Sequence, residues 1–241
     1  MRISVIVPAF NEEKLLGASL AQIRTAADAF TARGWEFQLV VCDNNSTDRT
    51  AEIARTAGAH VVFEPFNQIG RARNSGAGAA TGDWFIFVDA DSHPSRGLFD
   101  DVAEQITAGQ TVAGGATVEL DEKIFSANLI TGIWNLTSRF KKWVAGSFIY
   151  IQADAFRELG GFNPEIFAAE ELELSQRLKI LARARGKKVV ILHRHPLKTS
   201  ARKMKLYTPG EMFRFFLRSI FNHKRTMRSR EAAYLWYDGR R

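Results

Sequence analysis

The chain has 241 residues, of which 46% are hydrophobic, and this is enough apolar material for the core of one large domain. Its one cysteine, Cys42, excludes an intrachain disulfide and favours a reducing compartment. The sequence begins with a short apolar run rather than a signal peptide, and no apolar stretch is long enough to span a bilayer. We therefore expect a cytoplasmic globular protein.

The net charge of +7 is unevenly distributed. Residues 198–241 carry 12 Lys and Arg against three acidic residues, a charge of +9, which leaves the preceding residues at −2. Such a basic tail indicates an anionic partner, namely a membrane surface, a phosphorylated substrate or nucleic acid, although it also suits a solvated tail. An apolar helical stripe in this tail could lie at the inner face of a membrane or pack on the domain. The stripe consists of Met212, Phe213, Phe216, Leu217, Ile220 and Phe221.

Strand and helix patterns alternate through the first half of the chain. This alternation predicts an α/β fold with a doubly wound, mostly parallel sheet and helices on both faces. We expect strands at residues 3–7, 37–42, 60–63 and 84–88, and helices at residues 13–32, 46–57 and 70–80.

The second half is less regular. No linker is visible before about residue 199, so we expect one domain over residues 1–198, followed by a basic helical extension over residues 199–241. The expected helices of this half are residues 98–107, 126–140 and 170–184, and the expected strands are residues 111–120, 148–151 and 189–192.

Two carboxylates, Asp89 and Asp91, follow the apolar strand expected at residues 84–88. Residues i and i+2 of an extended chain point to the same side, so both carboxylates face one spot. In an open α/β sheet, ligands bind at the carboxyl ends of the strands, and hard oxygen ligands suit Mg²⁺ or Mn²⁺. The pattern predicts a divalent cation site, although a solvated turn would also explain it.

Two further polar segments suit a nucleotide. Asp43 and Asn44 follow the second expected strand and could accept the imide N–H of a base, or could simply form a turn and a helix cap. Arg71 and Arg73 lie in the first turn of the helix expected at residues 70–80. A helix N-terminus with arginine beside it binds phosphate well, although basic residues are also ordinary on a surface helix.

An acidic cluster that includes Glu170 and Glu171 opens the helix expected at residues 170–184. Either glutamate could be the general base that deprotonates an acceptor hydroxyl. Negative charge is also favourable at a helix N-terminus for electrostatic reasons alone. The residues by themselves leave both interpretations open.

Taken in order, these segments resemble the family 2 glycosyltransferases, which have the GT-A fold. The resemblance implies a Rossmann-like domain and a glycosyltransferase that moves a sugar from a UDP- or GDP-type nucleotide sugar to an acceptor hydroxyl. It also implies inversion at the sugar and a divalent Mg²⁺ or Mn²⁺ cofactor. The matching segments are residues 5–12, 41–50, 70–82, 87–91 and 160–178, within a resemblance that extends over residues 2–192.

The resemblance also implies the residues of the donor site. Arg71 or Arg73 would meet the diphosphate, and Gly146 would let the backbone approach the sugar. Many relatives carry a second aspartate at the position of Asn44, so the base stays open between uracil and guanine. The nucleotide pocket would be lined by Pro8, Ala9, Glu12, Asp43, Asn44 and Asp89.

The metal and the base follow in the same way. Asp91 would ligate the metal, with Asp89 facing either the metal or the ribose. His193 would complete the metal shell or would be an ordinary surface histidine. The family's acidic base usually appears as Glu-Asp, and here the pair is Glu170-Glu171, with Glu171 expected to take the proton. Residues 199–203 are similar to a segment of some relatives that could close over the diphosphate or the acceptor.

Other functions remain as alternatives. A sugar-phosphate nucleotidyltransferase would need a glycine-rich basic loop after the first strand, where this chain has Ala9-Phe10-Asn11-Glu12. An inactive nucleotide-sugar-binding module would result if both glutamates were misplaced. Nucleic acid would explain only the tail, and no nucleic-acid motif is present, so we do not expect it as a partner. The acceptor stays open between a lipid-linked molecule and a glycan.

Overall fold

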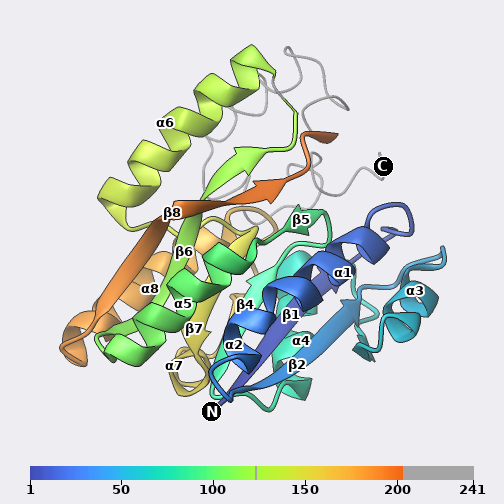
Figure 1. The fold of residues 1–241 in the computed structure, drawn as a ribbon, viewed down its shortest axis with the longest axis horizontal. Helices are drawn as coiled ribbons and strands as arrows, with labels where there is room; N and C mark the ends of the chain where they lie inside the picture. The colour runs from blue at the N-terminus through green and yellow to red at the C-terminus, as the bar shows by residue number, and fades with distance from the viewer. Residues whose placement is uncertain (123, 203–241) are drawn as a thin grey trace.

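The computed structural model describes residues 1–122 and 124–202. Within them, one mixed sheet has the strand order β3-β2-β1-β4-β7-β6-β8-β5, and helices cover both of its faces (Figure 1). The strands are β1 (Arg2–Ala9), β2 (Glu36–Asp43), β3 (His60–Phe63), β4 (Trp84–Val88), β5 (Ser92–His93), β6 (Thr111–Leu120), β7 (Phe148–Gln152) and β8 (Lys188–Thr199). The helices are α1 (Leu16–Ala26), α2 (Asp28–Thr31), α3 (Thr50–Thr56), α4 (Ile69–Ala79), α5 (Arg96–Ala108), α6 (Phe125–Lys141), α7 (Ala153–Glu158) and α8 (Glu170–Ala184).

The expected α/β class is therefore confirmed. Residues 203–241, which hold most of the expected extension and its whole apolar stripe, lie outside the described residues. None of the described helices combines the length and apolar content needed to cross a bilayer.

The first half of the chain forms the parallel part of the sheet. Strand β1 pairs in parallel with β2 and β4, and β2 pairs in parallel with β3. The register places Ala9 beside Asp43, at the carboxyl ends of β1 and β2. Because β4 runs in the same direction, Asp89 leaves the sheet at that same edge.

The second half extends the sheet with both antiparallel and parallel pairs, since β8 runs parallel to β6. Strand β7 runs antiparallel to β4 and to β6, and Val88 pairs with Phe148. This orientation brings the residues before β7, Gly146 and Ser147, next to the carboxyl end of β4. The Asp89 amide donates a hydrogen bond to the Ser147 carbonyl (3.2 Å).

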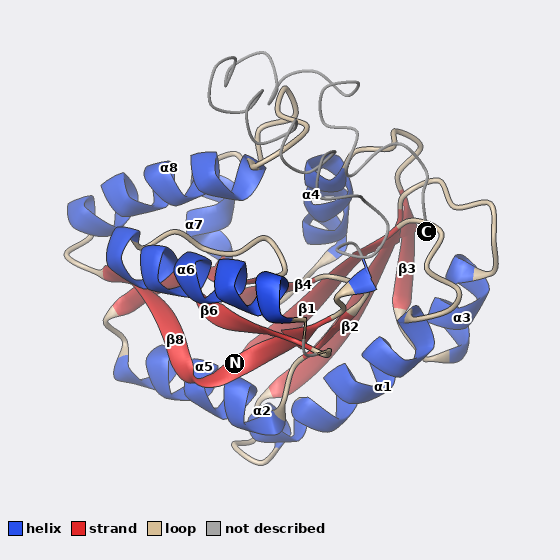
Figure 2. Cartoon of the chain, turned by 90° about the horizontal axis from the view of Figure 1, so that it is seen from above, coloured by secondary structure: helices blue, strands red, loops and turns tan. Residues whose placement is uncertain are grey.

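Alternating apolar residues on the strands supply two cores, one on each face of the sheet. Ile3, Val5 and Val7 of β1 pack toward α1, α2 and α5. Ile6 points to the other face, which is covered by α4, α7 and α8. Figure 2 shows these two helix layers on either side of the sheet. The alternation of period two along a fully buried strand is what makes two helix layers possible.

Two expected helices begin later than their sequences suggest. The helix expected at residues 13–32 starts at Leu16 and divides into α1 and α2, and the one expected at residues 46–57 starts at Thr50. The reason is that the two segments are hydrogen-bonded to each other. The Asn11 amide donates to Ser46 Oγ (3.0 Å), and the Glu12 amide donates to Thr50 Oγ1 (2.8 Å). These bonds satisfy the amides outside a helix, so residues 10–15 and 44–49 form turns and bends at the sheet edge before α1 and α3 begin.

The late strand is longer than the expected residues 189–192, because β8 runs on to Thr199. Its pairing with β6 is interrupted by an irregularity: Leu192 pairs with Ala116, and Leu197 pairs with Val118. The four residues 193–196 therefore bulge out of the ladder, where Pro196 has no N–H to offer. The short elements β5 and α7 were not expected from the sequence.

Candidate active site

A buried arginine organises the carboxyl edge of the sheet. Arg73, on α4, is 1% exposed. Its Nη1 donates to Glu170 Oε1 (2.5 Å), and its Nη2 donates to Asp89 Oδ1 (3.0 Å) and to the Gly146 carbonyl (2.8 Å). One guanidinium thus ties together α4, the end of β4, the loop before β7 and the start of α8. A buried charge of this kind is tolerated because it is paired and hydrogen-bonded.

The glycine-rich turn before α8 packs an aromatic side chain against this arginine. Gly160 and Gly161 both have positive φ values, of 71° and 72°, which side chains other than glycine rarely adopt. The turn sets Phe162 against the sheet, where the guanidinium of Arg73 lies 5.2 Å from the ring centroid. Asn74 Oδ1 accepts a hydrogen bond from the Phe162 amide (2.9 Å), which fixes the turn to α4.

A small cavity opens beside Arg73. Its volume is about 150 Å³, and its lining mixes charged, polar and apolar residues. Gly146 has no side chain, so its backbone can lie close to the cavity. A Cβ at this position would lie 3.2 Å from Arg73 Nη2 and 3.5 Å from the Glu171 carboxyl carbon. The cavity is lined by Ile69, Arg73, Asp89, Gly146, Ser147, Ala169, Glu170 and Glu171.

The two adjacent glutamates occupy different environments. Glu170 is 4% exposed and is held by the ion pair with Arg73. Glu171 lines the cavity, and burial together with the charge of Glu170 raises its pKa to about 8. A carboxyl with a pKa near the working pH, placed at a cavity wall, suits proton transfer. The structure thus pairs Glu170 with Arg73 and leaves Glu171 at the cavity wall.

The segment after β2 has its polar groups engaged with a neighbouring loop. Asn44 Nδ2 donates to the Phe66 carbonyl (2.6 Å), and Asn44 Oδ1 accepts from the Gln68 amide (2.9 Å). Asp43 Oδ1 accepts from the Ser46 amide (3.0 Å). Asn44 therefore shapes the loop at residues 64–68. Of the two residues expected to read a base, Asn44 is bonded to a neighbouring loop, whereas the Asp43 carboxylate accepts a hydrogen bond within its own turn.

The two arginines of α4 also differ. In contrast to Arg73, Arg71 is exposed, and its Nε donates to Gln68 Oε1 (3.1 Å). The guanidinium of Arg71 stacks over Phe66, 4.9 Å from the ring centroid. Arg71 is therefore the one that solution can reach, whereas Arg73 is committed to its carboxylates.

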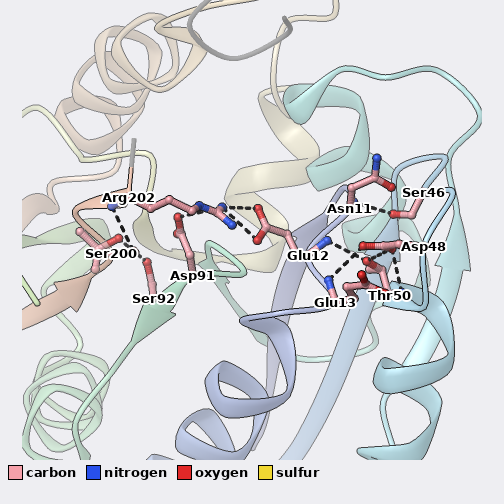
Figure 3. A network of polar contacts seen from close by, with 11 residues as sticks. Asn11, Glu12, Glu13, Ser46, Asp48, Thr50, Asp91, Ser92, Ser200 and Arg202 are labelled. Carbon is pink, nitrogen blue, oxygen red and sulfur yellow. Dashed lines mark hydrogen bonds and ion pairs between the residues drawn. The ribbon is translucent and has the colours of Figure 1, made fainter. Parts of the chain in front are cut away.

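A second charged cluster lies at the other side of the sheet edge. Arg202 Nη2 donates to both carboxylate oxygens of Glu12 (2.7 and 3.0 Å) and lies 3.7 Å from Asp91 Oδ2 (Figure 3). Glu12 and Asp91 are each 6% exposed. The guanidinium thus supplies positive charge at the carboxylate expected to hold a metal. Arg202 belongs to the segment over residues 199–203 that the sequence had singled out.

The donor set fits a divalent cation in its chemistry. Mg²⁺ is commonly held by one or two carboxylates, with water and substrate phosphates as the other ligands. Asp91 offers one carboxylate in a place that already accommodates a guanidinium, and Asp89 shares its carboxylate with Arg73. Among residues 1–122 and 124–202, no three His, Cys, Asp or Glu side chains gather as a complete metal shell.

His193 is exposed within the bulge of β8 and joins no such cluster with Asp89 and Asp91. Its neighbours in the bulge contact α5 instead: His195 Nδ1 lies 3.1 Å from Asp101 Oδ2, and Arg194 pairs with the same carboxylate (2.5 Å). This ion network fastens the bulge to the helix. The periodicity of the sequence gave no sign of a bulge here.

Pro8 and Ala9 end β1 at the same edge, and Ala9 is buried beside Asp43.

Gln68, which sequence reasoning missed, links the two halves of the edge. It is 1% exposed, and its Nε2 donates to the carbonyls of Pro164 (2.9 Å) and Ile166 (2.8 Å). No local pattern marks this glutamine, because its partners lie almost a hundred residues away.

Known proteins are similar to this chain in sequence and in fold. The model for "Glycosyl transferase family 2" matches residues 4–157. An uncharacterized glycosyltransferase of Mycobacterium tuberculosis is 34% identical over 113 residues, which cover 47% of each chain. An uncharacterized protein of Methanocaldococcus jannaschii is 28% identical over 224 residues, which cover 88% of this chain and 84% of that protein. The chain thus spans about half the length of the first curated relatives it matches.

Solved structures confirm the GT-A architecture. Staphylococcus aureus TarS 1–349 in complex with UDP-GlcNAc superposes with a TM-score of 0.66 at 21% identity, covering 97% of this chain and 69% of that one. The mannosyltransferase PcManGT from Pyrobaculum calidifontis, in complex with GDP-Man and Mn²⁺, gives a TM-score of 0.66 at 18% identity, over 88% of this chain and 59% of that one. Since the family model covers more than half of the sequence, the chain belongs to glycosyl transferase family 2.

Proposed function

We propose that this protein transfers a sugar from a UDP- or GDP-type nucleotide sugar to an acceptor hydroxyl, with inversion at the sugar. The observation that carries the proposal is the environment of Glu171, a carboxyl at a cavity wall with a pKa raised to about 8 by burial and by Glu170. Support for the donor class comes from the solved relatives, which hold UDP-GlcNAc or GDP-Man.

The nucleotide would lie over the carboxyl ends of β1, β2 and β4. Asp43 would accept the imide N–H of the base, while Asn44 holds the loop that walls the base pocket. Pro8, Ala9 and Glu12 would line the floor of this pocket. Arg71, which is exposed at the start of α4, would meet the diphosphate, where a helix N-terminus also favours negative charge.

Mg²⁺ or Mn²⁺ would be held by Asp91, with Asp89 as a second ligand or as a partner of the ribose. When bound, the cation supplies charge stabilisation for the departing diphosphate. Asp91 is the firmer ligand of the two, because Arg73 already claims an oxygen of Asp89. Arg202, which pairs with Glu12 beside Asp91, would have to move relative to Asp91 when a cation and a diphosphate arrive.

The proton of the acceptor hydroxyl would pass to the carboxylate of Glu171. As the proton leaves, the acceptor oxygen forms its bond to the anomeric carbon. The bond between that carbon and the diphosphate breaks, and its electron pair goes to the diphosphate. Attack from the side opposite the leaving group inverts the anomeric centre. Glu170 and Arg73 take no proton in this step: they hold Asp89 and the Gly146 carbonyl at the cavity wall.

A donor screen tests the proposal. Purified protein is incubated with UDP-GlcNAc, other UDP-sugars and GDP-Man, with Mn²⁺ present, and release of the nucleoside diphosphate is measured with and without candidate acceptors. We expect one nucleotide class to raise the melting temperature and to be hydrolysed slowly without acceptor. Donor binding without turnover by any acceptor, and with no change on Glu171→Gln, would instead support a binding module.

A further inference from the structure

Helix α6 is docked with its apolar side outward. Leu129, Ile133, Leu136 and Phe140 recur at i, i+4, i+7 and i+11, which places them in one narrow stripe along the helix. Their exposed fractions are 58%, 61%, 70% and 81%, and Ile130 beside them is 55% exposed. Figure 1 shows α6 along the border of the molecule, away from the parallel half of the sheet.

The inward side of α6 combines small and polar residues with the half-buried Trp134. Asn135 Nδ2 donates to the Val118 carbonyl (2.9 Å) and Asn135 Oδ1 accepts from the Val118 amide (2.9 Å), so this amide clamps the helix to β6. Ser138 Oγ donates to the Trp143 carbonyl (2.6 Å), and Ala127 is 1% exposed. A helix that keeps most of its apolar residues outward presents an apolar stripe of the kind that marks an interaction site.

The two ends of this stripe carry opposite charge. Asp121 and Glu122 lie just before α6, whereas residues 123–153 contain four Lys and Arg and no Asp or Glu. Arg139, Lys141 and Lys142 gather at the C-terminal end of α6, where Lys179 of α8 also reaches the Lys141 carbonyl (3.3 Å). An apolar stripe with basic residues at its border is the pattern of a helix that lies in the interface of an anionic bilayer.

The occupants that this chain itself could supply carry the wrong charge. A second copy would bring a chain of the same net charge, +7, and residues 203–241 carry ten Lys and Arg against three acidic residues. Either would place positive charge against positive charge, whereas anionic lipid headgroups would complement it. The charge therefore selects the membrane among the possible partners.

We propose that the outward stripe of α6 binds an anionic membrane surface, with its apolar residues among the acyl chains and its basic end among the headgroups. This surface contains no residue of the C-terminal tail. The end of α6 at Lys141 is five residues from Gly146 of the cavity, so extended chain would separate them by at most about 17 Å. Binding through α6 would thus keep the catalytic cavity close to the bilayer.

Vesicle flotation of the full chain tests this proposal. We compare vesicles of phosphatidylcholine with vesicles that also contain phosphatidylglycerol, and expect binding to the anionic ones that weakens with salt. The double variant Leu136→Ser/Phe140→Ser should bind at least about tenfold more weakly, because burying one such side chain is worth a tenfold factor or more. Lys141→Glu/Lys142→Glu should lose binding to the anionic vesicles by a similar factor.

Phe63→Ser is the matched control, since Phe63 is 61% exposed but lies on β3, at the other end of the sheet order. It should bind vesicles as the unaltered protein does. Circular dichroism melting checks that all variants fold. Wild-type protein that does not float with anionic vesicles would overturn the proposal, as would α6 variants that float undiminished through the tail. A loss of self-association in the α6 variants, without any vesicle binding, would overturn it in favour of a second copy.

Discussion

The pH dependence of transfer follows directly from the environment of Glu171. Its pKa is raised to about 8 by burial and by the neighbouring charge of Glu170. A base must be deprotonated to act, and with this pKa roughly one carboxyl in ten is ionised at pH 7 and roughly nine in ten at pH 9. We therefore expect the rate of transfer at saturating donor to rise about tenfold between pH 7 and pH 9.

Two variants test whether Glu171 causes this rise. Glu171→Gln should lower the rate by about 10²- to 10⁴-fold and abolish the inflection, since an amide cannot take the proton. Glu170→Gln should keep measurable transfer but move the inflection to lower pH, because the charge of Glu170 is one cause of the raised pKa. A flat profile from pH 6 to pH 9, or an inactive Glu170→Gln beside an active Glu171→Gln, would refute this assignment.

The same pKa has a consequence for stability. Since the folded pKa of Glu171 is raised, the protonated carboxyl stabilises the fold below its usual pKa of about 4.3, and this contribution is lost as the pH rises toward about 8. The amide of Glu171→Gln cannot ionise, so the variant should gain in free energy of unfolding over the unaltered protein as the pH rises from 5 to 9. Urea denaturation at a series of pH values measures this difference, and a difference that shrinks with pH would contradict the burial argument.

Three further substitutions probe the two charged clusters. Arg73→Met leaves the buried carboxylates of Glu170 and Asp89 without their counter-ion and should cost about 3–5 kcal/mol in the free energy of unfolding; a loss below 1 kcal/mol would mean that the ion pairs do not matter. Gly146→Ala puts a Cβ 3.2 Å from Arg73 Nη2 and should lower stability by about 1–3 kcal/mol in thermal melts, whereas an unchanged melting temperature would show that the loop yields. Arg202→Gln removes a cation 3.7 Å from Asp91 Oδ2 and should tighten Mn²⁺ binding in the absence of donor by about fivefold, as titration followed by electron paramagnetic resonance would detect; equal affinities would place the metal away from Asp91.

Local patterns in the sequence were sufficient for the elements and for the edge where ligands bind. The apolar run at residues 84–88 became β4, and the helix expected at residues 170–184 is α8 with those same limits. Strand and helix periodicities depend on neighbours within a few residues, so they can be recognised without the fold. Parallel strands then bring their carboxyl ends to one edge, which is why Asp43 and Asp89 lie on the same side.

The sequence pattern misleads where hydrogen bonds between distant segments replace the bonds of a helix. Residues 13–15 and 46–49 were expected to begin helices, yet hydrogen bonds between residues 11–13 and 46–50 satisfy their polar groups, and they stay outside α1 and α3. The bulge that carries His193 out of the sheet arises from how β8 pairs with β6, a strand whose paired residues lie almost 80 residues earlier. Such pairings have no signature within either segment alone.

The sequence by itself determined the α/β class, the ligand-binding edge and the residue types gathered there. Only the tertiary structure decided the environment of each member of a pair: Arg73 is buried among carboxylates while Arg71 is exposed, and Glu170 is bound to Arg73 while Glu171 lines the cavity. It also decided that α6 turns its apolar stripe outward. The physical reason is that burial, charge pairing and pKa depend on partners up to 190 residues away, and only the folded chain brings these together.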